Sequence, residues 1–192
     1  MRYTPVVRRR EAGFTLVELL VTVAVIAILA AIAIPSFFGE TRKARAMAEV
    51  TPMFNDLRIR MEQYLQERGV YPDTLGEDGL YPTDSPDATL RPIAPGGVLP
   101  GTWLALNIRI SGPDEVRCGY TWVTSRSGNG TVGPTTGNAG LKAKAAPFSF
   151  VAPANDWYYL LAKCRMDPGH TGYSWYFTSS LDSTIRPDNE GQ

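Results

Sequence analysis

The sequence is poor in the residues that build metal sites and catalytic centres. Its 192 residues include two cysteines and one histidine, His170, which are too few for a structural zinc site or for a serine triad with a well-placed base. Nucleotide-binding glycine patterns and the ligand spacing of calcium-binding loops are both missing. Charge of one sign is also not in excess, since 19 basic residues balance 19 acidic ones, which argues against nucleic acid as a partner. These absences predict a protein that is not an enzyme and uses no cofactor or metal.

The sequence does contain one long apolar run near its N-terminus. Residues 19–38 carry no charge, and a helix of that length spans about 30 Å, the thickness of a membrane's hydrocarbon core. A cleaved secretory signal is the alternative, because residues 8–10 are arginines and residues 31–33 imitate a peptidase site. The run is longer than such a signal needs and continues past that site, so we predict a membrane-spanning helix. The flanking basic residues favour a cytoplasmic N-terminus only slightly.

Glu18 stands at the edge of this run. An acidic group at the centre of a membrane costs about 2.5–3.5 kcal/mol, less near the interface, and usually has a partner. Periodicity leaves two interpretations open. Glu18 either has a functional partner or is an interfacial carboxylate that reaches the lipid head groups.

The residues around Glu18 carry a family resemblance. The stretch Gly13-Phe14-Thr15-Leu16-Val17-Glu18-Leu19-Leu20 resembles the processing site (class III type) of type IV pilins and pseudopilins. The resemblance implies that a prepilin peptidase removes residues 1–13 between Gly13 and Phe14, and that the amine of Phe14 is then methylated. It also implies that Glu18 pairs with the N-terminal amine of a neighbouring subunit, and that Pro35 bends the helix.

Beyond the apolar run the pattern becomes periodic. Six apolar residues recur at spacings of three and four: Met47, Val50, Phe54, Leu57, Met61 and Tyr64. This stripe predicts a helix that reaches about Arg68, with the stripe as core and with charged residues such as Glu49 on the other faces. Gly69 is a suitable residue to end it. Pro52, like Pro35, removes one backbone hydrogen bond and is expected to bend the helix.

The second half of the chain is typical of a small antiparallel sheet. Proline-rich residues 70–101 predict a loop. Strand-like runs follow at residues 102–110, 117–124, 148–151, 157–163 and 173–179. We therefore expect an α+β, pilin-like fold in which a long N-terminal helix packs on four or five antiparallel strands. The expected parts are a leader (1–13), an assembly helix (14–38), an amphipathic helix (39–69) and a head (70–192). In the head, residues 102–192 hold the sheet and a C-terminal region bounded by a disulfide.

Cys118 and Cys164 are the two thiols. Outside the cytoplasm an even pair predicts one disulfide, and the alternative is two buried free thiols. The resemblance favours the disulfide, because pilins commonly carry one near the C-terminus.

The function expected from the resemblance is that of a structural subunit of a type IV pilus, major or minor. Its partners would be other pilin subunits, the prepilin peptidase, the inner membrane and the assembly platform. Such a chain is an inner-membrane protein before assembly and part of a cell-surface filament afterwards. One alternative is a pseudopilin of a type II secretion or DNA-uptake system. Another is a membrane-tethered binding or enzymatic domain that never polymerises.

Overall fold

The structure is a computed structural model of the chain. It describes residues 13–72, 79–94, 99, 101–106, 115–125, 145–151, 153–169 and 171–189. The leader residues 1–12 and His170 lie outside these ranges. The chain divides into two compact units, residues 1–38 and residues 39–192.

The longest element is helix α1, Leu16–Arg68, which supplies residues to both units. It ends where the sequence predicts. Gly69 has a positive φ of 72°, which glycine adopts without steric cost, and its N–H donates to the Leu65 carbonyl at 2.8 Å. Pro52 lies inside the helix rather than at an end.

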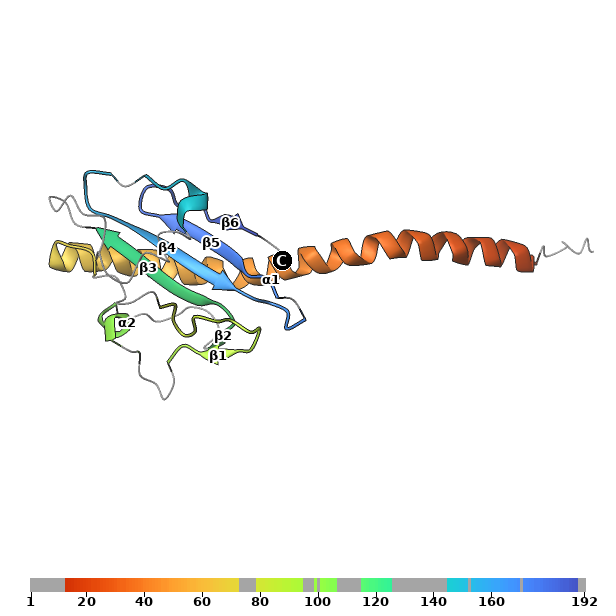
Figure 1. The fold of residues 1–192 in the computed structure, drawn as a ribbon, viewed down its shortest axis with the longest axis horizontal. Helices are drawn as coiled ribbons and strands as arrows, with labels where there is room; N and C mark the ends of the chain where they lie inside the picture. Colours follow the sequence, from red (N-terminus) through yellow and green to blue (C-terminus); the bar gives the residue numbers. More distant parts are fainter. Residues whose placement is uncertain are drawn as a thin grey trace, which may run out of the picture. The chain divides into compact units, whose positions relative to one another are not determined.

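The second unit contains a four-stranded antiparallel sheet in the order β3-β4-β5-β6 (Figure 1). Its strands are β3 (Gly119–Ser125), β4 (Trp157–Cys164), β5 (Ser174–Ser179) and β6 (Arg186–Asp188). Strands β1 (Arg91–Pro92) and β2 (Glu115–Val116) form a separate two-stranded sheet. The predicted α+β arrangement of a long helix with antiparallel strands is confirmed, and three of the five predicted strand runs correspond to β3, β4 and β5.

One face of the four-stranded sheet packs with the periodic stripe of α1. Val50, Phe54, Leu57 and Met61 are fully buried, and they share one cluster with aromatic and aliphatic side chains of β3, β4 and β5. The sheet contributes Tyr120, Trp122, Tyr158, Leu160 and Tyr176 to this cluster. Met47 and Tyr64, the ends of the predicted stripe, are partly buried against it. The stripe is therefore core, as its spacing predicts.

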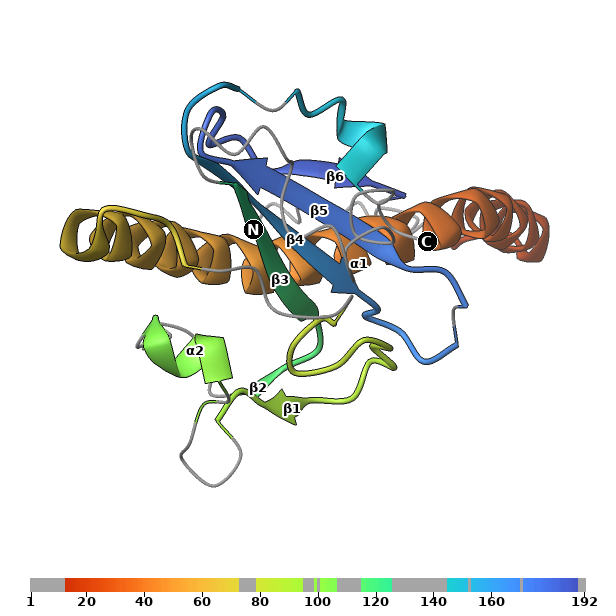
Figure 2. The same cartoon turned by 60° about the vertical axis from the view of Figure 1, so that its left-hand side comes forward.

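The opposite face of the sheet is buried as well. A short 3-10 helix, η2 (Ala146–Phe148), contacts β6 (Figure 2). Phe148 stacks on Phe177 of β5 with ring centroids 4.9 Å apart. The prediction of a strand at 148–151 is wrong. Pro147 within η2 has no N–H to give a ladder, and Ser149 turns the chain with a φ of 53°.

The strand predicted at residues 102–110 is also wrong in its described part. Gly101–Ala105 forms the short helix α2 instead. Trp103 and Leu106, three residues apart, are buried, whereas Leu104 is 57% exposed. A spacing of three matches one face of a helical turn, so burial of Trp103 outweighs the alternation of Leu104 and Leu106. Residues 107–110 lie outside the described ranges.

The segment from Tyr81 to Thr83, which comes before β1 in the chain, lies close to strand β3. Tyr81 and Tyr120 exchange two backbone hydrogen bonds of 2.8 and 2.7 Å. Next to this bridge, a Cβ added to Gly119 would lie 2.1 Å from the carbonyl oxygen of Thr83. Gly119 therefore allows two backbones to meet where no side chain fits.

Candidate functional site

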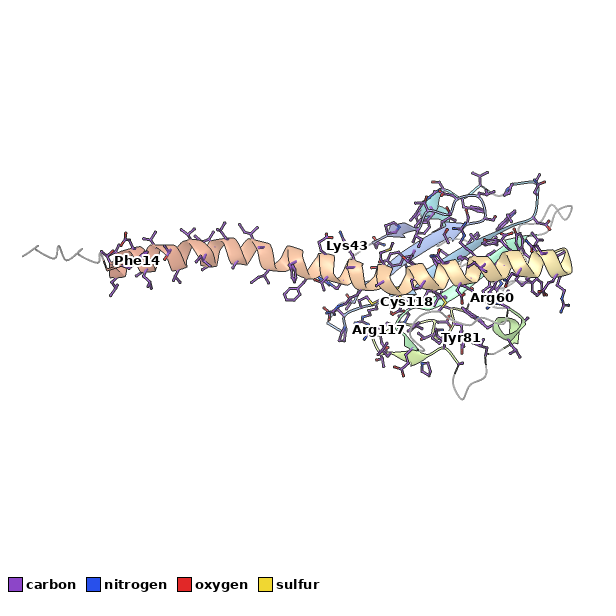
Figure 3. The ribbon with its side chains drawn as sticks, turned by 180° about the vertical axis from the view of Figure 1, so that it is seen from behind. Phe14, Lys43, Arg60, Tyr81, Arg117 and Cys118 are labelled. Atoms are coloured by element: carbon purple, nitrogen blue, oxygen red, sulfur yellow. A yellow bond between two sulfur atoms is a disulfide. The ribbon has the colours of Figure 1, made fainter. Side chains whose placement is uncertain are left out.

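The predicted cleavage site lies just before helix α1. Phe14 is 82% exposed, and Figure 3 labels it at the start of the helix. A Cβ added to Gly13 would meet no atom of the described residues within 4 Å. Among the described residues, none therefore packs over the junction between Gly13 and Phe14.

The first turn of α1 is closed by Thr15 and Glu18. The Glu18 N–H donates to the Thr15 hydroxyl oxygen at 3.2 Å, and the Thr15 N–H donates back to Oε2 of Glu18 at 3.0 Å. The Thr15 hydroxyl donates to the same carboxylate oxygen at 2.8 Å. This reciprocal pattern is a capping box, and it holds a negative charge at the positive end of the helix dipole.

The capping box places the Glu18 carboxylate beside Phe14. Its Oε2 lies 3.0 Å from the amide nitrogen of Thr15, the first amide after Phe14. This role was not predicted from the sequence, although Thr15-Leu16-Val17-Glu18 before an apolar run is its usual signature. The carboxylate of Glu18 is thus fixed one residue from the amine that cleavage would release.

After Glu18 the first part of α1 is apolar and exposed. Its large apolar side chains up to Phe38 range from 50% to 72% exposed, and they include Leu19, Val25, Leu29, Ile32 and Phe37. The polar Thr22 donates its hydroxyl hydrogen to the Leu19 carbonyl at 2.9 Å, inside the helix. Among the described residues, α1 is the one helix that is long and apolar enough to cross a membrane by length and composition.

A second polar feature lies in the other unit. Oε1 of Glu49 on α1 accepts the N–H groups of Arg117 and Cys118 at 2.8 and 2.7 Å, and the Tyr120 hydroxyl at 3.1 Å. Burial raises the pKa of Tyr120 well above its usual range, with a further contribution from the neighbouring Glu49. The sequence placed Glu49 on a charged outer face. The structure shows it half-buried against the turn between β2 and β3.

The two cysteines are joined. The Sγ atoms of Cys118 and Cys164 form a disulfide, and both residues are buried, with exposed fractions of 0% and 1%. The bridge connects the residue before β3 to the last residue of β4. In the part of the chain that the structure describes, no cluster of three or more histidine, cysteine or acidic side chains could hold a metal ion.

A shallow pocket of about 750 Å³ lies along the second part of α1. It is lined by Asn55, Arg58, Ile59, Glu62, Gln63, Gln66, Tyr158 and Ser180. Two of its polar groups already have partners, because Arg58 donates to the Ser183 carbonyl at 3.3 Å and Glu62 accepts the Tyr71 hydroxyl at 3.1 Å. The pocket does not bring together the nucleophile and base that a hydrolytic site needs.

Residues 8–34 match the family described as the prokaryotic N-terminal methylation motif. That range contains Gly13, Phe14 and Glu18 together with most of the exposed apolar helix. The chain is type IV pilin-like.

Three relatives show how far this likeness extends. The chain is 42% identical over 57 residues to the type IV major fimbrial protein FimA of Dichelobacter nodosus, a match to 30% of this chain and 35% of that protein. It is 37% identical over 73 residues to the type IV major pilin protein PilA of Myxococcus xanthus, covering 38% and 33%. It is 33% identical over 86 residues to the type II secretion system core protein G of Aeromonas hydrophila, covering 42% and 57%.

The matches thus span 33% to 57% of the lengths of these relatives. No solved structure matches the chain with statistical significance. In this pilin-like chain the structure places Gly13, Phe14 and Glu18 together at the start of α1, and it joins Cys118 to Cys164 in the other unit. Pro35 lies within α1, and the bend expected there stays a prediction.

Proposed function

We propose that the chain is a structural subunit of a type IV pilus that polymerises through the first part of α1. The observation that supports this most is the helix itself, which exposes its apolar side chains and begins with a fixed carboxylate beside the Gly13–Phe14 junction. A soluble single chain gains nothing from such a surface, because apolar groups in water are unfavourable. Lipid and other copies of the same helix are the two environments that suit it.

In this proposal a prepilin peptidase cuts after Gly13 and methylates the amine of Phe14. The cut removes four arginines and one glutamate with the leader. Before assembly the chain is held in the inner membrane by one span, with its N-terminus on the cytoplasmic side. The assembly platform then moves subunits into a cell-surface filament, and Pro35 bends the helix within it.

Glu18 provides the specific contact of the proposal. Both hydrogen bonds that its carboxylate accepts from described residues reach Oε2, while a carboxylate has acceptor sites on two oxygens. Oε1 can therefore receive the Phe14 ammonium of a neighbouring subunit. An unpaired charge at membrane depth carries an uncompensated desolvation penalty, and the mutual attraction of the two charges offsets that cost for both. A contact from the start of one helix to the start of the next does not close on itself, and such contacts produce filaments.

The decisive test is Glu18→Ala. It leaves the incoming ammonium without a partner, a loss of about 3–5 kcal/mol, which lowers subunit association by a factor of hundreds to thousands. We expect processed subunits that stay in the membrane and very few filaments in sheared supernatants. Glu40→Ala is the matched control, because Glu40 is an exposed acid on the same helix that forms an ion pair with Lys43 at 2.9 Å. Normal filament yield from Glu18→Ala would exclude the proposed role of Glu18.

Processing is tested separately by mass. The purified subunit should have lost residues 1–13 and gained one methyl group on Phe14. A chain that instead begins near Ser36 would support the signal-peptide interpretation and contradict membrane-anchored assembly.

A pseudopilin of a type II secretion or DNA-uptake system is the second candidate, favoured by the match to a type II secretion core protein G. Deletion of the gene distinguishes the two. Loss of surface filaments with normal protein secretion supports the pilus, whereas retained surface filaments with blocked secretion or DNA uptake support the pseudopilus. A tethered domain that never polymerises predicts subunits that cannot be cross-linked to each other.

A further inference from the structure

The turn between β2 and β3 depends on α1 for its hydrogen bonds. Arg117 and Cys118 lie after the β1–β2 register and before the β3–β4 register, so neither strand ladder includes them. Their N–H groups donate instead to Glu49, and Figure 3 shows both residues beside α1. A buried N–H group without an acceptor is costly, and a hydrogen bond to a carboxylate is stronger than one to a neutral group. Glu49 therefore holds this turn in place.

The two cysteines are positioned by different means. The β3–β4 register ends at Gly119 opposite Lys163, so Cys118 stands opposite Cys164 one step beyond the last pair. Cys164 is still inside the sheet, because it pairs with Ser174 of β5. Cys118 lacks such a pair in the registers, and its N–H is fixed by Glu49 at 2.7 Å. The sheet thus orients one thiol and Glu49 orients the other.

We propose that Glu49 is the positioning residue for the disulfide, holding Cys118 where Cys164 can reach it. Three donors meet on its Oε1, so one side chain holds both the backbone just before β3 and the hydroxyl of Tyr120 within β3. Without Glu49, residues 117 and 118 lose their acceptor and the two thiols spend less time within bonding distance. The argument for this role does not rest on whether the chain assembles into a filament.

The covalent step needs an external disulfide, for which glutathione serves as the probe. One cysteine thiolate attacks oxidised glutathione and releases one glutathione thiol. The second cysteine then displaces the other glutathione from the mixed disulfide. Overall, two protons and two electrons pass from the cysteines to two glutathione molecules. Glu49 makes no bond in this exchange. Its role is to raise the effective concentration of the Cys118 thiol that the Cys164 thiol encounters.

The experiment measures that effective concentration in the full chain, purified in detergent and kept folded as judged by circular dichroism. The protein is equilibrated with mixtures of oxidised and reduced glutathione, and free thiols are trapped with a maleimide. Glu49→Ala should lower the effective concentration roughly tenfold, the value of one hydrogen bond to a charged group. Glu49→Gln should lower it less, because the amide oxygen remains an acceptor. Glu62→Ala is the control, since Glu62 also accepts a tyrosine hydroxyl but does not touch the turn.

The outcomes separate positioning from general bracing. A residue that only braces the fold would reduce the melting temperature and leave the effective concentration of the folded protein at the wild-type value. That result in Glu49→Ala would overturn the proposal. If Glu49→Ala does not fold, Glu49→Gln decides, and a value equal to that of the wild type would overturn the proposal equally.

Discussion

Leu29 and Leu57 lie in the same helix and have opposite environments. Leu29, in the first unit, is 62% exposed, whereas Leu57, in the second, is fully buried under the sheet. Both stretches are helical, so helix propensity does not explain the difference. The second stretch has apolar residues on one stripe and finds its partner within the chain. The first is apolar all round, and a helix of that kind needs a partner on every side. One helix thus carries one surface used for folding and another left for lipid or other subunits.

Loss of the disulfide should affect the second unit most strongly. Cys118→Ala combined with Cys164→Ala opens a loop closed by residues 46 apart, worth about 4 kcal/mol in the chain-entropy treatment. Urea unfolding of the full chain in detergent should show this loss, and pilus yield should fall. Under the proposed function, cleavage after Gly13 should continue, because Gly13 lies in a different compact unit from the two cysteines. A variant that accumulates with its leader attached would show that the two units are coupled during processing.

The Leu29 and Leu57 pair tests the comparison directly. Leu57→Ala removes a fully buried side chain and should lower the free energy of unfolding of the second unit by about 3 kcal/mol. Leu29→Ala removes an exposed one, so the same unfolding transition should not move. Thermal denaturation followed by tryptophan fluorescence reports on the second unit, where Trp103, Trp122, Trp157 and Trp175 are buried. Equal shifts from both variants would mean that the two surfaces are not distinct.

The smallest expected effect comes from acid. The Arg186 side chain, with the Thr184 N–H, lowers the pKa of Asp182 to about 2. A depressed pKa in the folded state stabilises the fold above the ordinary pKa of an aspartate, near 4, and this contribution is lost as the pH falls towards 2. Asp182 lies one residue before Ser183, whose carbonyl accepts a hydrogen bond from Arg58 of α1. NMR titration should give the low midpoint, and Arg186→Gln should move it back towards 4. A midpoint near 4 in the wild-type chain would rule out the ion pair in solution.

The helix could be predicted well because its signals are local. The stripe from Met47 to Tyr64 and the stop at Gly69 depend only on spacing and on one glycine, and both are confirmed. Strands β3, β4 and β5 could be predicted because their sequences are rich in aromatic and β-branched residues. The processing residues could be named because Gly13, Phe14 and Glu18 are close together in the sequence.

The errors occur where distant contacts decide the local structure. Residues 101–105 became helical because Trp103 turns into the core, where its ring centroid lies 5.1 Å from that of Trp122. Residues 148–151 did not form a strand because Phe148 and Phe150 cover the sheet instead of extending it. Strand β6 has only three residues, one of them a proline, and carries almost no sequence signal. Glu49 was assigned to an outer face because the N–H groups that donate to its carboxylate lie about seventy positions further along the chain.

Gly119 has a consequence for how this chain tolerates mutation. Any other amino acid would bring a Cβ to within 2.1 Å of a backbone oxygen, and backbone cannot rotate away as a flexible side chain can. Gly119 also follows Cys118 directly and is the first residue of the edge strand β3. In a library that samples all twenty amino acids at every position, residue 119 should therefore be among the most restricted outside the N-terminal segment. Alanine at position 119 should be nearly as depleted as the larger amino acids, because its Cβ alone already clashes with the carbonyl oxygen of Thr83.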